Sequence, residues 1–443
     1  MFQHWCRIAV PLSAAAICSL SILSAHSAVA REYRLRPLYS FCSDPGCADG
    51  GEPVSGLVSD ASGNLFGTTS SGAHGAGTAF RLVPEPGGHR YHFRTIYSFC
   101  ALNGCLDGNG AVPGVPLIID RQGNLYGVAE LGGSSGFGVA FELTPNRNGK
   151  NWALRVLYNF CSANSNCTDG QEPNALTYQG QAAGVPYDGV SPLYGVGFSG
   201  GSHFGGAAFS LRPKSDGSWG EQVLYSFCRE SGCSDGSAPY SVTVDGSGNL
   251  VGFARTPDES QLLFRLSPAS DQKKWTEAIL YKFCSLANCA GGAYPNGPPL
   301  IDDSGNIFGT TYGGGSTGNG VLYKVAPDNS ETVLHNFCEL ERCLDGRFPD
   351  GNLIMDAAGD LYGTAAAGGR YDNDPSKIGG GTVFKFSDGS LSVVRAFCAE
   401  ANCADGQSPV GNLTLDSAGK LFGVTELGGS VSAGTVFELQ PPS

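Results

Sequence analysis

The residues best placed to do chemistry recur once in each repeat of this 443-residue chain. Two cysteines separated by four or five residues are followed, in six of seven copies, by an Asp-Gly dipeptide. The aspartates are Asp49, Asp107, Asp169, Asp235, Asp345 and Asp405. As candidate binding residues, they predict an acidic ring on one face that attracts a cation or a basic partner. The alternative is structural, with each carboxylate capping its own turn.

Two histidines are the other candidates for ligand contact. His74 and His203 lie in glycine-rich loops of the first and third copies, on the face where we expect the cysteine loops to emerge. The alternative is that both are solvated loop residues. No His-Glu-x-x-His motif or zinc spacing occurs, and the acidic run at residues 372–374 lacks the rest of an EF-hand. We therefore expect no metal, no cofactor and no assigned catalytic residue.

Several nucleotide and hydrolase motifs match only superficially. Gly-x-Ser-x-Gly occurs at residues 132–136 and 314–318, and a dinucleotide-type glycine pattern spans residues 313–318. None is followed by the helix that these motifs require. All three matches are better explained as loops between strands.

The cysteines are paired in the sequence once per repeat. Of 16 cysteines, Cys6 and Cys18 precede the repeats, and the other 14 are Cys42 and Cys47, Cys100 and Cys105, Cys161 and Cys167, Cys228 and Cys233, Cys284 and Cys289, Cys338 and Cys343, and Cys398 and Cys403. Bonding each cysteine to its near neighbour is the only scheme that respects the repeat, and such short turns can reach disulfide distance. Two thiolates with no nearby histidine would make a poor zinc site, so we expect seven disulfides.

The elements that carry these residues are β-strands. The copy from Ile96 to Leu143 contains four short apolar segments rich in branched or aromatic residues and bounded by Gly, Pro, Asn or Asp. First cysteines of successive copies lie 58, 61, 67, 56, 54 and 60 residues apart. A period of this length with four strands in each copy predicts an all-β fold, a seven-bladed β-propeller with four antiparallel strands per blade.

The repeat also predicts the order of strands in each blade. A proline follows each cysteine loop and marks the start of the innermost strand, because the first residue of a strand need not donate to the ladder. The Leu-Tyr-Gly strand is second, the Val-Phe-Glu-Leu strand third and the Leu-Tyr-Ser-Phe strand outermost. The chain begins with an outermost-type strand, Tyr33 to Phe41, and ends with a third-type strand, Thr435 to Leu439. We therefore expect the N-terminal strand to close the seventh blade.

Two smaller features of the repeat carry structural expectations. Asp-x-x-Gly-Asn, as in Asp60 to Asn64, predicts a tight hairpin between the first two strands, which the stretched third copy lacks. A glycine follows the second-strand aromatic in every copy, and we expect it to permit close backbone approach near the channel. These glycines are Gly67, Gly127, Gly195, Gly252, Gly309, Gly363 and Gly423.

The ends and the composition indicate an exported protein. Residues 1–30 carry Arg7, an uncharged run from Ile8 to Leu23 and then Ala28-Val29-Ala30, the pattern of a cleavable signal peptide. Residues 31–443 would then form a single propeller domain. With 40 acidic and 27 basic residues, the net charge of −13 disfavours nucleic acid and anionic membranes. We expect a secreted or periplasmic monomer with no membrane insertion after signal cleavage.

The recurring phrases resemble one known family. LYSFC, DG, D-x-x-G-N-L-[YF]-G-T, G-G and G-T-V-F-x-L, spread from Arg31 to Leu439, are similar to the GloVer tandem repeats of exported bacterial "choice-of-anchor" proteins. The resemblance implies an exported, propeller-like protein. It supplies no catalytic residues to carry over.

Three functions are compatible with these residues. The scarcity of catalytic side chains favours a non-catalytic exported module that binds a glycan, a peptide or a surface protein at the loop-bearing face. The alternatives are a secreted hydrolase or lyase that uses acidic residues on that face, and an inert envelope scaffold. An enzyme would need loops that break the sevenfold pattern, and the third and sixth copies supply them.

Overall fold

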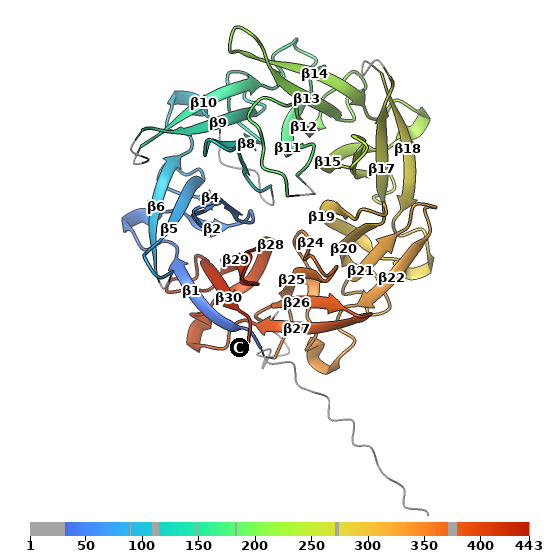
Figure 1. Cartoon of the computed structure of the whole chain (residues 1–443). Helices are drawn as coiled ribbons and strands as arrows, with labels where there is room; N and C mark the ends of the chain where they lie inside the picture. Colours follow the sequence, from blue (N-terminus) through green and yellow to red (C-terminus); the bar gives the residue numbers. More distant parts are fainter. Residues whose placement is uncertain are drawn as a thin grey trace, which may run out of the picture. The chain divides into compact units, whose positions relative to one another are not determined.

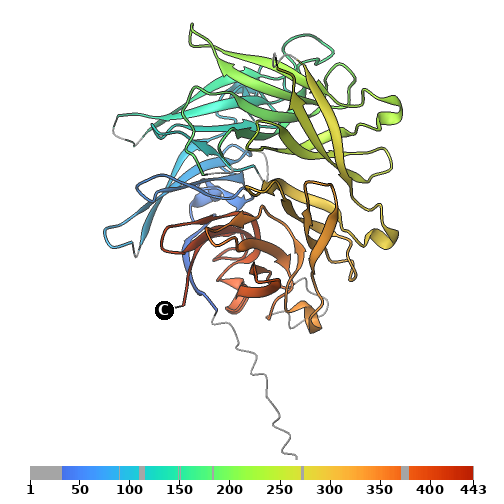
Figure 2. The same ribbon diagram turned by 45° about the vertical axis from the view of Figure 1, so that its right-hand side comes forward.

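A computed structural model describes residues 32–88, 90–108, 115–147, 149, 151–181, 184–270, 274–370 and 379–442. The predicted signal peptide at residues 1–30, the second-copy Pro113 and the acidic run at residues 372–374 lie outside these ranges. The described strands form seven antiparallel sheets arranged in a ring (Figure 1), which confirms the predicted propeller. Each sheet is twisted, as the turned view in Figure 2 shows.

The first three blades follow the predicted order, from the innermost strand outward. The first contains β2 (Gly51–Pro53), β3 (Val58–Ser59), β4 (Leu65–Ser71), β5 (Thr78–Pro84) and β6 (Tyr91–Ser98). The second contains β7 (Ile118–Ile119), β8 (Leu125–Ala129), β9 (Val139–Pro145) and β10 (Trp152–Asn159). The third contains β11 (Gln171–Tyr178), β12 (Leu193–Ser199), β13 (Ala207–Pro213) and β14 (Trp219–Ser226).

The next three blades repeat the same arrangement. The fourth contains β15 (Ser237–Val244), β16 (Leu250–Arg255), β17 (Gln261–Pro268) and β18 (Trp275–Lys282). The fifth contains β19 (Ala293–Ile301), β20 (Ile307–Gly313), β21 (Val321–Val325) and β22 (Glu331–Asn336). The sixth contains β23 (Arg347–Pro349), β24 (Ile354–Met355), β25 (Leu361–Ala367), β26 (Thr382–Ser387) and β27 (Ser390–Ala396). In the first and sixth blades the innermost strand is split into two short pieces.

The seventh blade joins the two ends of the described chain. It contains β28 (Gln407–Leu415), β29 (Leu421–Leu427), β30 (Thr435–Gln440) and, outermost, β1 (Arg34–Ser40). β1 pairs antiparallel with β30 from Arg34 opposite Gln440 to Ser40 opposite Thr435. The N-terminal strand therefore closes the ring, as predicted, and gives β30 a partner on its outer edge.

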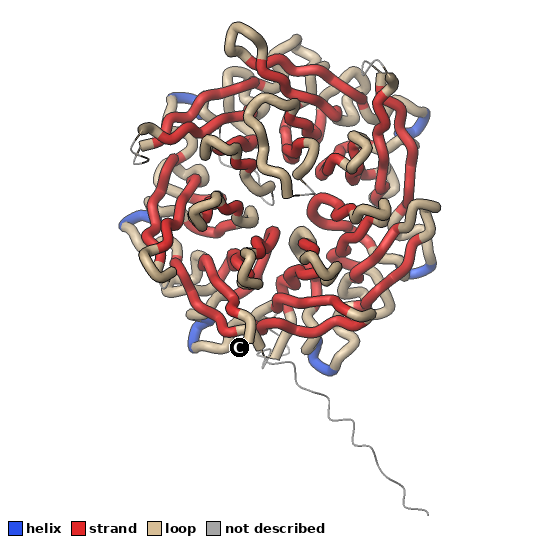
Figure 3. The backbone as a smooth tube through the Cα atoms, in the orientation of Figure 1, coloured by secondary structure: helices blue, strands red, loops and turns tan. Residues whose placement is uncertain are grey.

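The predicted cysteine pairing is confirmed in all seven copies, and each disulfide closes a loop of five or six residues. Six of the loops contain a single turn of 3₁₀-helix, and these turns lie on the outer circumference of the ring (Figure 3). They are η1 (Pro45–Cys47), η2 (Asn103–Cys105), η3 (Ser231–Cys233), η4 (Ala287–Cys289), η5 (Glu341–Cys343) and η6 (Ala401–Cys403). On the loop-entropy model each bond contributes about 2 kcal/mol.

The predicted hairpin between first and second strands is also confirmed. The Oδ1 atom of Asp60 accepts hydrogen bonds from the backbone N–H of Ser62 at 2.9 Å and of Asn64 at 3.0 Å. The third copy differs, because its longer hairpin reaches across to the second blade. There the backbone of Tyr187 forms a parallel β-bridge with that of Asp120. The Tyr187 side chain, only 1% exposed, packs edge-on against Tyr126, with ring centroids 5.2 Å apart.

A repeated cluster of aromatic rings fills the space between neighbouring blades. The phenylalanine before the first cysteine of each pair contacts the third-strand aromatic of the following blade, with ring centroids 4.8–5.2 Å apart. Phe99 and Phe141 are one such pair, and both are fully buried. The hydrophobic core is therefore a set of clusters, each shared by two blades.

The second-strand glycines serve this core, which corrects the expectation that they lie against the channel. A Cβ atom on Gly127 would lie 2.6 Å from Cζ of Phe141 and 3.0 Å from Cδ2 of Leu117. The equivalent positions Gly67, Gly195, Gly252, Gly309, Gly363 and Gly423 meet the third-strand ring of their own blade in the same way. Glycine is needed because the tip of the third-strand ring occupies the space that a Cβ atom would take. No helix in the described residues is long and apolar enough to span a membrane.

Candidate functional site

The six Asp-Gly aspartates each follow the second cysteine of their disulfide by two positions, and their carboxylates contact the disulfide loop. All are 0–3% exposed. In the first copy, Asp49 accepts hydrogen bonds from the Tyr39 hydroxyl at 2.6 Å and from the backbone N–H of Ser43 at 2.9 Å and of Asp44 at 3.1 Å. This geometry is the capping alternative, in which the carboxylate organises its turn.

The other five aspartates repeat this capping arrangement. A side chain from the preceding outermost strand contacts each carboxylate at 2.6–3.3 Å: Tyr97, Tyr158, Tyr225, His335 and Arg395. Backbone N–H groups of the loop complete each set, as for Ala101 with Asp107. A binding role for Asp49, Asp107, Asp169, Asp235, Asp345 and Asp405 stays a prediction, and they contribute nothing to the cavity described below.

The two candidate histidines lie in exposed turns between second and third strands. His203 Nδ1 is 2.9 Å from the Ser202 hydroxyl, and His74 is exposed. Neither lines the cavity described below. Within the described ranges no three His, Cys, Asp or Glu side chains are grouped as a metal site would require.

Two half-buried glutamates beside the aspartate caps make stability depend on pH. Burial first, and then the charge of Asp169, raise the pKa of Glu221 to about 8. Burial and the charge of Asp235 do the same for Glu277, whose pKa is also about 8. Both glutamates hold a proton in the folded protein at a pH where the unfolded chain has lost it. The stability they confer is therefore complete below about pH 4.5 and declines as the pH rises toward 8.

We expect a measurably lower melting temperature at pH 8.5 than at pH 5.5, and the Glu221→Gln/Glu277→Gln variant to reduce that difference. Glutamine keeps the shape of the protonated acid and cannot ionise. Thermal melts at both pH values measure the effect, with the exposed Glu341→Gln variant as the control for loss of one negative charge. An undiminished pH dependence in the double variant would contradict the assignment.

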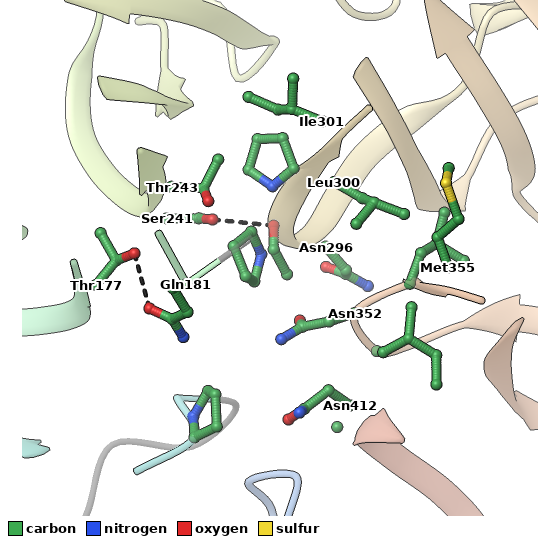
Figure 4. A pocket seen from close by; sticks show the side chains of 18 of the residues that line it. Thr177, Gln181, Ser241, Thr243, Asn296, Leu300, Ile301, Asn352, Met355 and Asn412 are labelled. Atoms are coloured by element: carbon green, nitrogen blue, oxygen red, sulfur yellow. Dashed lines mark hydrogen bonds between the residues drawn. The ribbon is translucent and has the colours of Figure 1, made fainter. Parts of the chain in front are cut away.

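The channel of the ring contains a cavity of about 1340 Å³. It is lined mainly by the innermost strands and the hairpins that follow them, from the second to the seventh blade. Figure 4 shows that many lining side chains are amides and hydroxyls, including Thr177, Gln181, Ser241, Asn296, Asn352 and Asn412. Such groups both donate and accept hydrogen bonds without carrying charge.

Several of these polar groups are not used by the fold. Asn352 is 8% exposed, makes no hydrogen bond within the described part of the chain, and turns its amide nitrogen toward the open centre of the cavity (Figure 4). The Oδ1 atoms of Asn174 and Asn412 are buried without a partner. By contrast, Ser241 donates to the Gly297 carbonyl at 2.9 Å and Thr177 to Gln181 at 2.9 Å. Buried amides left without partners are uncommon, and a bound ligand is one explanation for them.

Six acids line the same cavity: Glu130, Asp302, Asp303, Asp350, Asp356 and Glu426. Three of them have raised pKa values. Burial first, and then the charge of Glu426, raise the pKa of Asp350 to about 6. The pKa of Glu426 is raised by burial and by the charge of Glu52, and that of Glu130 by burial and by the charge of Glu172. The only side-chain contact to the Asp350 carboxylate within the described residues is a long one, from Asn296 Nδ2 at 3.5 Å.

Glu426 and Glu130 belong to a repeated set of positions between neighbouring blades. The residue before each blade's proline has positive φ at Glu52, Glu172, Ala238, Tyr294, Phe348 and Ser408. Its N–H donates to the loop of the preceding blade, as Phe348 does to the Asn319 carbonyl at 2.9 Å. The residue before the proline therefore lies beside one residue of the preceding blade. That residue comes three positions after the preceding blade's second-strand glycine. Tyr312 and Phe348 form one such pair, stacked at 4.9 Å with an interplanar angle of 12°.

We call these inter-blade positions the rim. The rim includes two acid pairs, Glu426 with Glu52 and Glu130 with Glu172, and the aromatic pair of Tyr312 and Phe348. Sequence reasoning missed the rim and the channel amides, because neither position holds the same residue type from copy to copy. If the seven copies are aligned on their prolines, the rim and channel positions differ in residue type from copy to copy, whereas the positions beside them do not.

Two solved structures resemble this chain over part of their own length. No curated protein matches the chain. The chain is similar to a solved structure of a puromycin hydrolase mutant complexed with PGG (15% identity, TM-score 0.49), of which it spans 53% while 89% of this chain is covered. It is also similar to Trypanosoma rangeli sialidase in complex with the inhibitor DANA (10% identity, TM-score 0.40), of which it spans 57% while 81% of this chain is covered.

The repeats themselves match a family model over residues 29–191 and 260–443, which is more than half of the chain. The matched stretches include the LYSFC-type phrase of six copies and the Asp-Gly dipeptide of five. The chain therefore belongs to the Gloeobacter/Verrucomicrobia repeat family.

Proposed function

We propose that this protein is an exported, non-catalytic binding module that takes part of a glycan into the channel of its propeller. The observation that carries this proposal is the 1340 Å³ cavity lined by amide and hydroxyl side chains, several of which have no partner in the fold. A sugar presents hydroxyl groups that can both donate and accept hydrogen bonds, so it complements carboxamides. Volumes of this order are typical of ligand sites.

The aromatic part of the rim supports a sugar over a peptide. Tyr312, stacked on Phe348, and Tyr294 are exposed or half-buried on one side of the ring. Exposed aromatic faces provide flat apolar surfaces on which the C–H face of a sugar ring can pack. Export is supported by the seven disulfides, which persist in oxidising compartments, and by the signal-like pattern of residues 1–30.

An oligosaccharide array followed by calorimetric titration tests the proposal. We expect at least one class of oligosaccharide to bind, and the Asn352→Ala/Asn412→Ala variant to lose about tenfold or more in affinity, because each amide supplies a buried hydrogen bond. Asn166→Ala, an amide exposed on the third disulfide loop, is the control and should bind normally. An array with no bound glycan would reject the proposal and leave the inert scaffold as the better interpretation.

A hydrolase is the second candidate function, because one observation favours it. The pKa of Asp350, about 6, is close to what a general acid needs near neutral pH, and Glu426 lies close enough to influence it. If the protein hydrolyses glycosides, Asp350→Asn and Glu426→Gln should each lower turnover of an array-positive oligosaccharide by at least a hundredfold. Binding without product release from the wild type would reject this candidate.

A further inference from the structure

The acid pairs of the rim have no cationic partner in the described part of the chain. Glu426 and Glu52, and likewise Glu130 and Glu172, repel each other across inter-blade boundaries. No Lys or Arg of the described ranges forms an ion pair with any of these four or with Asp350. By contrast, the buried Glu438 has two basic partners, Arg36 and Lys420. The acid pairs therefore carry negative charge that no ion pair of the described residues balances, in contrast to Glu438.

Acidic side chains lie in the same cavity as the unpartnered amide that indicates a ligand site. Asp350 and Asn352 are two residues apart, between β23 and β24, and line the same cavity. Asn352, more than nine-tenths buried and without a hydrogen-bond partner, directs its amide nitrogen into that cavity (Figure 4). Glu426 and Glu130 line the cavity too, and they come from the seventh and second blades. A single oligomeric ligand in the channel could therefore contact acids from more than one blade.

Mutual repulsion of the acids costs free energy in the empty protein. Burial and neighbouring like charge raise the pKa values of Asp350, Glu426 and Glu130, so each carboxylate is destabilised relative to one in water. A bound cation would relieve this repulsion and would be attracted by the acidic chain as a whole.

We infer that the ligand carries protonated amines, and that the channel selects an amino sugar with a free amine over its N-acetylated or amine-free counterpart. This inference rests on the proposed glycan-binding function and names the substrate class of the same site. The amine would contact Asp350 and the acid pair of Glu426 and Glu52, while hydroxyl groups of the sugar would reach Asn352 and the other channel amides.

Calorimetric titration with three oligomers of equal length tests the inference: glucosamine, N-acetylglucosamine and glucose. We expect the glucosamine oligomer to bind at least tenfold more tightly than the other two at low salt, and this advantage to shrink in 0.5 M NaCl, because screening weakens charge interactions. Equal affinity for all three oligomers would overturn the inference and leave the proposed function intact. Binding of none of them, together with a blank array, would reject both.

Variants separate the acids from the rest of the channel. Asp350→Asn/Glu426→Gln should reduce the advantage of the glucosamine oligomer at least tenfold while leaving its melting temperature at neutral pH unchanged or higher. Glu341→Gln, on the exposed loop of the sixth disulfide, is the matched control and should keep the full preference. A double variant that is folded and still prefers the amine as strongly as the wild type would overturn the inference. If the double variant does not fold, the wild-type comparison of the three oligomers decides.

Discussion

A chain that begins at residue 42 instead of residue 32 is expected to lose the cooperative melting transition of the folded ring. The missing segment contains β1, the outermost strand of the seventh blade, and its removal leaves β30 with a long unpaired edge. Circular dichroism and size-exclusion chromatography measure the outcome, which we expect to be an unfolded or aggregated chain.

The size of this effect follows from how many blades the segment contacts. Phe41 is fully buried and packs against Phe80 of the first blade at 5.1 Å, while Tyr39 stacks on Phe93 at 3.8 Å. At the other end, Tyr33 donates to the Val394 carbonyl of the sixth blade at 3.0 Å. Loss of the Phe41 ring alone would cost about 3–5 kcal/mol, which is a large part of typical domain stability.

A second consequence of the deletion is electrostatic. Arg36 forms an ion pair with Glu438, a completely buried acid whose other basic partner is Lys420. Leaving a buried charge without any partner usually costs about 3–5 kcal/mol, and we expect a smaller loss here because Lys420 still pairs with Glu438. A peptide of residues 32–41 added in trans should restore part of the transition. An unchanged melting temperature in the shortened chain would contradict closure of the ring by this strand.

Much of this fold could be predicted from sequence because each blade repeats the same short-range sequence features. The proline, the capping aspartate of each hairpin and the cysteine pair act within one copy, so their roles follow from spacing alone. The hydrogen bonds of Asp60 and the seven disulfides agree with that prediction. Closure by β1 could be predicted because the two ends of the chain supply complementary strand types.

Features that depend on contacts between blades were harder to predict. Glu52 and Glu426 are far apart in sequence and meet only because the ring closes. The hairpin of the third copy could be recognised as unusual, yet nothing in its sequence places Tyr187 beside Tyr126 of the neighbouring blade. For the Asp-Gly aspartates, both a binding role and a capping role could be stated from the sequence, and the hydrogen bonds of Asp49 show the cap.

The second prediction of a large effect concerns replacement of the second-strand glycines by alanine. It distinguishes a clash of the new Cβ with a side chain from a clash with the backbone. Gly127→Ala would bring its Cβ to 2.6 Å from the Phe141 ring, whereas Gly252→Ala would bring its Cβ to 2.1 Å from the Ser241 carbonyl oxygen and 2.8 Å from Phe264. We expect losses of about 1–3 kcal/mol for the first variant and more for the second, because a backbone carbonyl in a ladder cannot move aside. Chemical denaturation measures both values.

Replacing the third-strand phenylalanine by leucine should restore the stability of only one of the two glycine variants. Adding Phe141→Leu to Gly127→Ala removes the atoms that clash, so stability should partly recover despite the cavity left beside Phe99. Adding Phe264→Leu to Gly252→Ala leaves the Ser241 carbonyl in place, and we expect no recovery. Gly246→Ala is the matched control, since its Cβ would meet nothing within 4 Å, and it should change stability by less than about 0.5 kcal/mol. Equal rescue at both sites would mean that the ring alone sets the need for glycine in the second strand.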